Sequence, residues 1–255
     1  MPPRRVIVTR PAQEAARWVE ALRNAGLDAV ALPLIAIAPM ADTGALRNAH
    51  AHLHRCTALM FVSAAAVAHF FAAVPDPRVR VRCWATGPGT THALRAAGVA
   101  AEWIDAPADD AGQFDSEALW ARVHAQVHQG GRVLFVRGAD AAGKAAGRDW
   151  LARQVESAGG EVETVAAYRR LVPHLDADAR QLALDGARGA ATWLFSSSEA
   201  IGNLRELLPN TGWPAARAVV THTRIAQTAR EAGFGHVHTS SPTLPALVAS
   251  IELAG

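Results

Sequence analysis

Serine, threonine and arginine residues stand directly after most of the short apolar runs of this chain. We predict that these runs are strands and that each polar group precedes a helix, so it combines a side-chain donor with free backbone N–H groups and the positive end of a helix dipole. Such an arrangement binds anions, although serine and threonine are also good helix N-caps, and capping stays open at any single position. The polar groups are Thr9-Arg10-Pro11, Ser63, Thr86-Gly87-Pro88-Gly89-Thr90-Thr91, Arg137-Gly138, Ser196-Ser197-Ser198, Thr221-His222-Thr223-Arg224 and Thr239-Ser240-Ser241.

The charge composition also favours a small anionic ligand. Lys and Arg number 25 against 23 Asp and Glu, a net charge of +2 with neutral histidine, and this balance argues against a nucleic-acid or membrane-surface partner. Lys144 is the single lysine, so nearly all fixed positive charge is guanidinium. Because guanidinium is planar and forms paired hydrogen bonds, it suits carboxylate or phosphate groups.

The familiar cofactor and metal motifs are missing from the sequence. The stretch Thr86–Thr91 contains GxG but has Thr91 in place of the third glycine, and Pro88 removes an N–H donor, so it is no dinucleotide or Walker loop. The histidines show no metal-ligand spacing, and His50, His52 and His54 are expected to spread around a helix surface. No GxSxG nucleophile elbow occurs. We therefore expect neither a cofactor nor a metal.

Tyr168 is the only tyrosine of the chain and stands beside Arg169 and Arg170. A phenol with a pKa of ~10 stays protonated at neutral pH and can donate a proton or a hydrogen bond to a departing oxygen. The other reading, a tyrosine that packs a joint between domains, is equally open from position alone.

Short apolar runs alternate with longer Ala/Leu/Arg stretches of helical period, which is typical of βα units around a parallel sheet. The helix expected over 12–25 places Ala16, Val19, Leu22 and Arg23 on one stripe and ends at Gly26. The class is α/β, and we expect strands over Arg5–Thr9, Asp28–Leu32, Ala58–Val62, Arg82–Thr86, Ala100–Ile104, Arg132–Val136, Glu161–Val165, Thr192–Phe195, Arg217–Thr221 and Gly235–His238.

The chain repeats itself. Phe61–Val67 matches Phe195–Ile201, and Arg5–Arg10 matches Arg132–Arg137, so the order of segments is A-B-A′-B′, with A near 1–36, B near 57–104, A′ near 132–165 and B′ near 191–238. Two extended segments that end at or near a proline, Pro33–Met40 and Ala166–Pro173, lie outside these repeats. We interpret them as linkers that cross between two domains.

Length and cysteine content limit the remaining classes. With 255 residues, of which 50% are hydrophobic, the chain is long enough for one large or two ordinary domains. Cys56 and Cys83 have neither disulfide-framework nor zinc spacing and are expected in the core. A signal segment and an apolar run of ~18 residues are both absent, so we expect a soluble cytoplasmic protein.

Taken in order, six motifs resemble those of the uroporphyrinogen-III synthase family. They are Val8-Thr9-Arg10-Pro11, Phe61-Val62-Ser63-Ala64-Ala65-Ala66-Val67, Gly87-Pro88-Gly89-Thr90, Arg137-Gly138, Ala167-Tyr168-Arg169-Arg170 and Phe195-Ser196-Ser197-Ser198-Glu199-Ala200-Ile201. The resemblance implies two Rossmann/flavodoxin-like parallel-sheet lobes joined by a two-stranded connector, lobe one being 1–36 plus 172–255 and lobe two 37–171. It also implies a cofactor-free lyase of tetrapyrrole biosynthesis, which closes hydroxymethylbilane to uroporphyrinogen III and inverts the terminal pyrrole.

The same resemblance implies roles for single residues. Tyr168 would assist the leaving oxygen as the catalytic residue. The substrate carries eight carboxylates, and the groups that would position them and the pyrroles are Arg10, Ser63, Thr90, Thr91, Arg137, Ser197, Ser198 and Arg224. Two loops depart from the family pattern, because Ala65 stands where an asparagine is frequent and His222-Thr223-Arg224-Ile225 lacks the glycines of its first-half counterpart. We expect a monomer.

Two other functions remain open on the sequence. A two-lobed sensor or binding protein could hold an anion at the same strand ends, although it would need a partner module. A sugar-nucleotide transferase would need a carboxylate pair for a divalent metal, and the nearest pair, Asp109-Asp110, is better interpreted as solvated loop.

Overall fold

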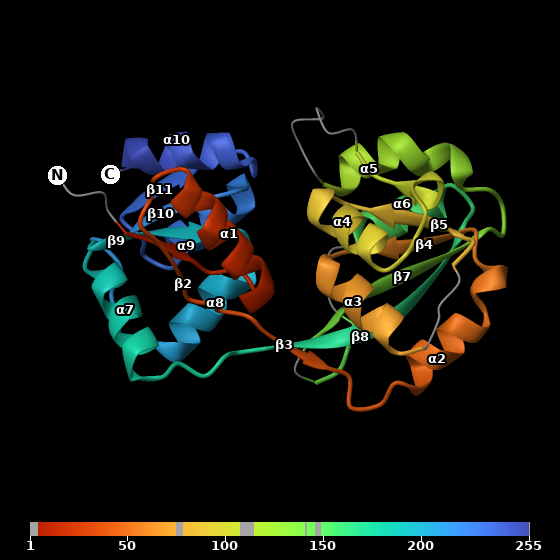
Figure 1. Cartoon of the computed structure of the whole chain (residues 1–255), viewed down its shortest axis with the longest axis horizontal. Helices are drawn as coiled ribbons and strands as arrows, with labels where there is room; N and C mark the ends of the chain where they lie inside the picture. The colour runs from red at the N-terminus through yellow and green to blue at the C-terminus, as the bar shows by residue number, and fades with distance from the viewer. Residues whose placement is uncertain (1–4, 75–78, 108–114, 141, 146–148, 255) are drawn as a thin grey trace. The chain divides into compact units, whose positions relative to one another are not determined.

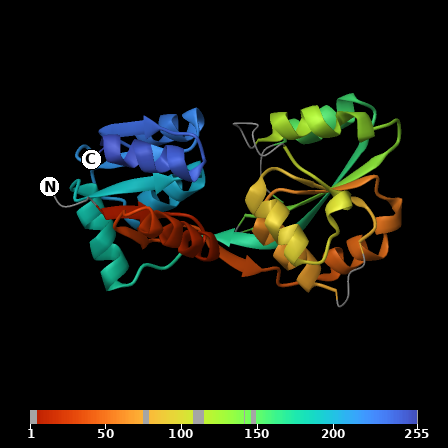
Figure 2. The same ribbon diagram turned by 45° about the horizontal axis from the view of Figure 1, so that its top comes forward.

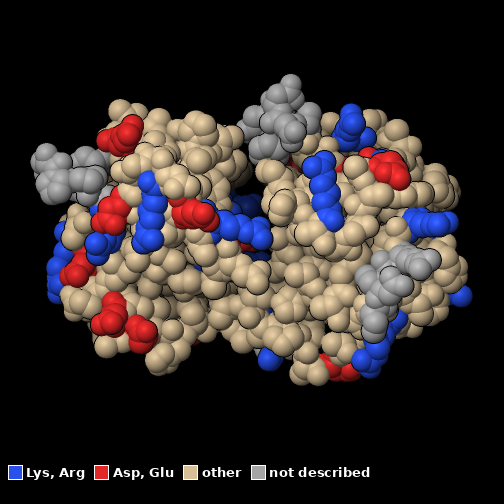
Figure 3. Space-filling model, viewed as in Figure 1, with Lys and Arg blue, Asp and Glu red and all other residues tan. Residues whose placement is uncertain are grey.

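The chain forms two compact units, each built around its own β-sheet (Figures 1 and 2). Unit 1 comprises Met1–Ala36 and Leu171–Gly255, and unit 2 comprises Ile37–Arg170. This computed structural model describes residues 5–74, 79–107, 115–140, 142–145 and 149–254, so Asp109-Asp110 lies outside the described residues. Acidic and basic side chains are interspersed on the face shown in Figure 3.

Unit 1 has a five-stranded sheet in the order β2-β1-β9-β10-β11, and each neighbouring pair is parallel. Its strands are β1 (Arg5–Val8), β2 (Ala29–Ala31), β9 (Ala191–Phe195), β10 (Arg217–Val220) and β11 (His236–Thr239). Its helices are α1 (Ala12–Asn24), α7 (Ala177–Ala187), α8 (Ser198–Leu207), α9 (Thr223–Glu231) and α10 (Leu244–Ala254).

Both faces of the unit 1 sheet are covered, which is why its central strands are mostly apolar. Helices α1 and α10 pack on the face that carries Val6, Val8 and Leu194. On the other face α7 lies so close to Trp193 that a methyl group on Gly186 would come within 2.8 Å of its ring.

The apolar stripe of α1 differs from the predicted one. Ala15, Val19 and Leu22 are its buried residues, whereas Ala16 and Arg23 are exposed. The stripe therefore follows the i, i+4, i+7 spacing and starts one residue earlier than predicted.

Unit 2 contains the second sheet, in the order β3-β8-β7-β4-β5-β6. Its strands are β3 (Ala36–Pro39), β4 (Ala58–Phe61), β5 (Arg82–Ala85), β6 (Ile104–Asp105), β7 (Arg132–Ala139) and β8 (Glu161–Leu171). Its helices are α2 (Gly44–Ala51), η1 (Leu53–Arg55), α3 (Ala64–Ala72), α4 (Pro88–Ala96), η2 (Ala101–Trp103), α5 (Ser116–Val123), η3 (His124–Gln126) and α6 (Trp150–Ser157).

The two sheets share one strand order. In unit 1 the order is β2-β1-β9-β10-β11, and in unit 2, apart from the edge strand β3, it is β8-β7-β4-β5-β6. Strands β7 and β8 thus correspond to β1 and β2, and β4, β5 and β6 correspond to β9, β10 and β11. Both sheets have the flavodoxin-like order 2-1-3-4-5. Each unit therefore combines the A segment of one repeat with the B segment of the other. The predicted class, two parallel-sheet α/β lobes, is confirmed.

The segments predicted as linkers are paired strands. Pro33–Met40 contains β3, and residues 166–171 continue β8, which is the neighbour of β3 in the sheet. Two strand ends were also misplaced. Strand β7 continues to Ala139, and the strand predicted over Ala100–Ile104 is a 3-10 turn followed by the two-residue β6.

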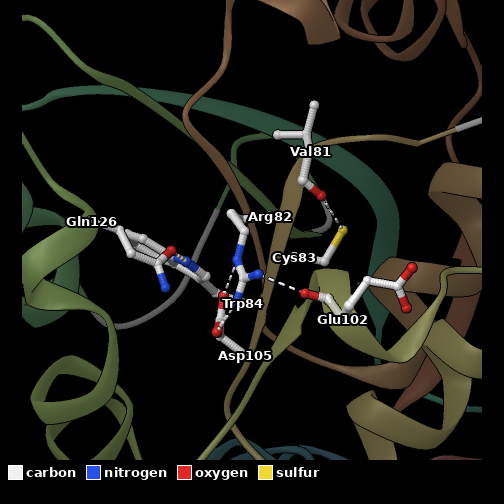
Figure 4. A network of polar contacts seen from close by, with 7 residues as sticks. All are labelled: Val81, Arg82, Cys83, Trp84, Glu102, Asp105 and Gln126. Atoms are coloured by element: carbon white, nitrogen blue, oxygen red, sulfur yellow. Dashed lines mark hydrogen bonds and ion pairs between the residues drawn. The ribbon is translucent and has the colours of Figure 1, made fainter.

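A polar network fixes β6 at the edge of the unit 2 sheet (Figure 4). Arg82 on β5 donates to both carboxylate oxygens of Asp105, from Nε at 2.7 Å and from Nη2, and Nη1 donates to the Glu102 carbonyl at 2.5 Å. The hydrogen bond to Asp105 raises the pKa of Arg82. Next to it, Trp84 Nε1 donates to Gln126 Oε1 at 2.8 Å. The bonds from Arg82 hold β6, which is too short to be fixed by its ladder alone.

Candidate active site

In each unit the strand order reverses at one point, and ligands of open α/β sheets bind beyond the strand ends at such a point. The reversal lies between β1 and β9 in unit 1 and between β7 and β4 in unit 2. Arg10 and Ser197 follow β1 and β9, whereas Ser63 follows β4 and Arg137 lies near the end of β7. Four of the predicted site residues thus occupy the two switch points, two in each unit.

The serines at both switch points are helix N-caps. Ser63 Oγ accepts the N–H of Ala66 at 3.1 Å, and Ser197 Oγ accepts the N–H of Glu199 at 3.2 Å. Capping, the open alternative, is therefore what both side chains do in this structure. Each hydroxyl keeps its own proton for a further hydrogen bond.

Two side-chain contacts fix Arg10 and leave its Nε–H donor unpaired within the described chain. Its Nη1 pairs with Glu14 Oε2 at 3.1 Å, and its guanidinium carbon lies 4.7 Å from the ring centroid of Trp18. Burial lowers its pKa, and Glu14 opposes that effect. Among the described residues, its buried Nε has no hydrogen-bond partner.

Arg137 has the same surroundings in unit 2. Its Nη1 pairs with Asp149 Oδ1 at 2.8 Å, and its guanidinium carbon lies 5.3 Å from the Phe135 centroid. Its side chain is 5% exposed, and within the described chain its Nε is likewise buried without a partner. A guanidinium fixed by one acid and one ring, with an N–H left over, is preorganised for another carboxylate oxygen.

Arg137 was predicted to follow its strand and to precede a helix, and both expectations were wrong. It lies within β7, because β8 continues to pair with β7 as far as Ala139. The next helix of the described chain, α6, begins only at Trp150.

Tyr168 lies in the core of unit 2, where it is 4% exposed. Its Oη is 3.0 Å from Ser63 Oγ, and either oxygen can be the donor. Tyr168 therefore packs in the core of unit 2 and reaches the switch point with its hydroxyl. This packing lies within one unit, and the catalytic role stays a prediction.

A β-bulge aims this tyrosine. Arg137 pairs with Ala166, but Gly138 pairs with Tyr168, so Ala167 is an extra residue of β8. Because side chains alternate between the faces of a strand, the extra residue brings Tyr168 to the same face as Val136. Gly138 makes room for it, since a Cβ at that position would lie 2.7 Å from Tyr168 Cζ.

The remaining predicted residues flank these switch points. Thr90 and Thr91 belong to the first turn of α4, where Thr90 is 6% exposed and Thr91 Oγ1 donates to the Gly87 carbonyl at 3.2 Å. In unit 1, Ser198 Oγ accepts a hydrogen bond from Thr228 Oγ1 at 3.0 Å. Arg224 is exposed in the first turn of α9.

Sequence reasoning missed several residues of these sites. Glu14 and Trp18 are four and eight residues after Arg10 in or beside one helix, so helical spacing could have indicated them. Asp149 gave no such signal, and Gly138 was named beside Arg137 without the packing role that the structure gives it. His222, named in the strand-end group Thr221-His222-Thr223-Arg224 but given no role of its own, caps α9 by accepting the Arg224 N–H on Nδ1 at 3.0 Å.

A cavity of about 150 Å³ lies elsewhere in unit 2, beside the start of β7, and contains none of the predicted site residues. Its lining is Asn48, Ala49, His52, Arg55, Cys56, Arg132, Leu134 and Glu163. Cys56 was predicted in the core but is half-buried here, and burial raises the pKa of its thiol. The thiol is therefore a weak nucleophile at neutral pH.

Two further features bear on the sequence predictions. His50 is half-buried and stacks on Phe70 with a centroid separation of 4.0 Å, so the predicted surface position is wrong. In the part of the chain that is described, no cluster of three potential metal ligands occurs, and no helix is long and apolar enough to span a membrane.

The repeated strand order and the polar switch points define a two-unit α/β protein whose strand ends suit an anionic ligand. The family model for uroporphyrinogen-III synthase HemD matches residues 16–249. The chain therefore belongs to the uroporphyrinogen-III synthase family, whose enzymes are cyclising lyases of tetrapyrrole biosynthesis.

Solved structures share this fold over nearly the whole chain. Uroporphyrinogen-III synthetase from Helicobacter pylori is similar at a TM-score of 0.60 and 14% identity, covering 98% of this chain and 99% of that one. A mutant uroporphyrinogen III synthase from the extremely thermophilic bacterium Thermus thermophilus is similar at a TM-score of 0.55 and 16% identity, with 98% of each chain covered.

Proposed function

We propose that this chain closes hydroxymethylbilane to uroporphyrinogen III and inverts the terminal pyrrole ring. The observation that carries the proposal is the duplicated arginine site. Arg10 and Arg137 are each fixed by an acid and an aromatic ring, and each keeps a buried Nε–H without a partner among the described residues. Guanidinium groups held in this way suit a substrate that carries several carboxylates.

Tyr168 assists the first chemical step. As the C–O bond of the hydroxymethyl group breaks, the phenol gives its proton to the leaving oxygen, which departs as water and leaves an azafulvene. Ser63 Oγ, 3.0 Å from the phenol oxygen, can stabilise the phenolate by donating a hydrogen bond until the proton released in the last step returns to it. The far pyrrole then attacks through its substituted carbon and forms a spiro intermediate, and the product follows by rearrangement and loss of a proton.

The other site residues bind and orient the substrate. Arg10, Ser197, Ser198 and Arg224 act in unit 1, and Ser63, Thr90, Thr91 and Arg137 act in unit 2. Free bilane closes spontaneously to the unflipped isomer, so the main task of these residues is to hold the conformation in which the slower attack comes first.

We further propose that the protein works as a monomer in the cytoplasm and without a cofactor. The reaction is a dehydration with no change of oxidation state, so proton transfer and positioning are sufficient for it. Both cysteines are free, as is usual in proteins of reducing compartments.

The decisive experiment gives enzymatically generated bilane to the purified, metal-stripped protein and separates the ring isomers. We expect uroporphyrinogen III in large excess over isomer I. Arg10→Lys and Arg137→Lys should each raise KM about 10-fold, because a lysine cannot reproduce the fork of donors. Arg153→Lys, at an exposed position of α6, is the matched control.

Tyr168→Phe should lower kcat by at least about 10-fold, since it removes a proton donor and leaves the ring in place. An isomer ratio equal to that of the spontaneous reaction would overturn the proposed function. Full activity of Tyr168→Phe would overturn only the role given to the phenol.

A further inference from the structure

His69 lies beside the phenol ring of Tyr168. The two ring centroids are 5.7 Å apart and the ring planes are inclined by 25°, so the rings are stacked. His69 is half-buried in α3, and burial lowers the pKa of its imidazole. The ring is therefore neutral near pH 7 and puts no positive charge next to the phenol. Neither the motifs nor the proposed mechanism assigned this residue a role.

We propose that His69 is a positioning residue that keeps the Tyr168 hydroxyl on Ser63. The inference rests on the function proposed above for Tyr168. Its basis is that one helix contacts the tyrosine at two points, because Ser63 is the N-cap of α3 and His69 lies in the same helix. Their separation is set by the helix, so the ring and the hydroxyl of Tyr168 are located together.

The other contacts of Tyr168 leave this task open. The β-bulge at Ala167 sets the face from which the side chain leaves β8, and Gly138 provides the space beside the ring. The bulge and Gly138 belong to the sheet, whereas His69 contacts the tyrosine ring from helix α3. Without the imidazole, the phenol can tilt towards the vacated space. A shift of about 0.5 Å or more at Oη lengthens the 3.0 Å contact with Ser63 beyond hydrogen-bond distance.

The single tyrosine makes a direct test possible. In protein carrying isotope-labelled tyrosine, every tyrosine ring signal in an NMR spectrum comes from Tyr168. We expect nuclear Overhauser effects between this ring and Ser63 in the wild type. They should weaken clearly in His69→Ala, because a nuclear Overhauser effect falls with the sixth power of distance, and keep their intensity in His69→Phe, which retains a ring that can stack. His92→Ala, at an exposed position of α4, is the control and should change nothing.

Steady-state kinetics with bilane provide the second readout. His69→Ala should lower kcat about 3-fold to 10-fold with KM within about 2-fold, because a small misplacement of a catalytic group slows chemistry more than binding. His69→Phe should restore kcat. The unfolding midpoints of all variants are measured alongside, and His69→Gln replaces His69→Ala if the alanine variant is not folded.

Two results would overturn the inference. One is a His69→Ala variant that keeps both the contacts with Ser63 and the wild-type kcat. The other is a His69→Phe variant that loses as much as His69→Ala, since stacking would then not be the cause. If His69→Ala loses the contacts while Tyr168→Phe is fully active, the positioning role holds and the catalytic role of Tyr168 falls.

Discussion

Replacement of Gly138 by alanine tests the packing that aims Tyr168. The added Cβ would lie 2.7 Å from Tyr168 Cζ, 2.8 Å from Cε2 and 3.0 Å from Arg170 Cδ. Ordinary contacts between such atoms are 3.4–4 Å, so the ring must move by about 1 Å or the strands must separate. Overpacking of this kind costs about 1–3 kcal/mol of unfolding free energy. Loss of the hydrogen bond to Ser63 adds about 1 kcal/mol.

Urea unfolding followed by circular dichroism measures this change, and the isomer assay measures the loss of activity. We expect Gly138→Ala to be destabilised by about 2–4 kcal/mol and to make less uroporphyrinogen III. Gly202→Ala is the matched control, because its Cβ would meet nothing within 4 Å and its position in α8 is exposed. This control should be stabilised by about 0.5–1 kcal/mol.

A double-mutant cycle identifies the ring as the cause. Leucine at position 168 lacks the atoms that the new methyl group would contact, so Gly138→Ala should cost much less in the Tyr168→Leu background. An equal cost in both backgrounds, or a Gly138→Ala protein as stable as the wild type, would refute the reasoning.

Three further predictions concern stability. Arg82→Met should cost about 2 kcal/mol of unfolding free energy in urea, because Asp105 is only 6% exposed and would lose its guanidinium partner. Arg5→Met breaks an ion pair that is about half exposed and should cost less than about 1 kcal/mol. Equal costs would contradict the idea that burial of Asp105 sets the difference. Burial lowers the pKa of His50, so the folded state binds fewer protons than the unfolded chain. The melting temperature should therefore fall as pH drops below about 6.5. His50→Gln should make this fall with pH less steep, and an equally steep fall would be evidence against the role given to His50. Ser197→Ala should cost about 1 kcal/mol through the lost N-cap, and Ser63→Ala about 2 kcal/mol because it also loses the hydrogen bond to Tyr168. A cost below about 0.3 kcal/mol for Ser197→Ala would show that its cap does not matter.

Much of the fold could be predicted because it depends on neighbours in sequence. The apolar runs and the helical periods between them indicated βα units, and the two matched pairs of segments indicated the duplication. The exchange of repeats between the sheets was implied only by the family resemblance. The strand-end serines were indicated for the same reason, since an N-cap such as Ser63 is recognised from the residues that follow it.

Strand ends and register were harder to predict. Arg137 was placed after its strand because nothing within 132–140 shows that β8 pairs with β7 as far as Ala139. The bulge at Ala167 depends on the same pairing. Cys56 was assigned to the core on residue type alone, whereas its half-buried position follows from the cavity beside α2.

The sequence by itself determined the α/β class, the duplication and the types of donor at the strand ends, because each follows from local spacing. Only the tertiary structure decided which donors meet. Ser63 and Tyr168 are 105 residues apart and come into contact because β8 pairs with β7 and β7 with β4. A bulge of one residue then turns the phenol to the face of α3, where His69 lies. Such contacts depend on pairing between strands that are distant in sequence, and the spacing of residues within one strand does not predict that pairing.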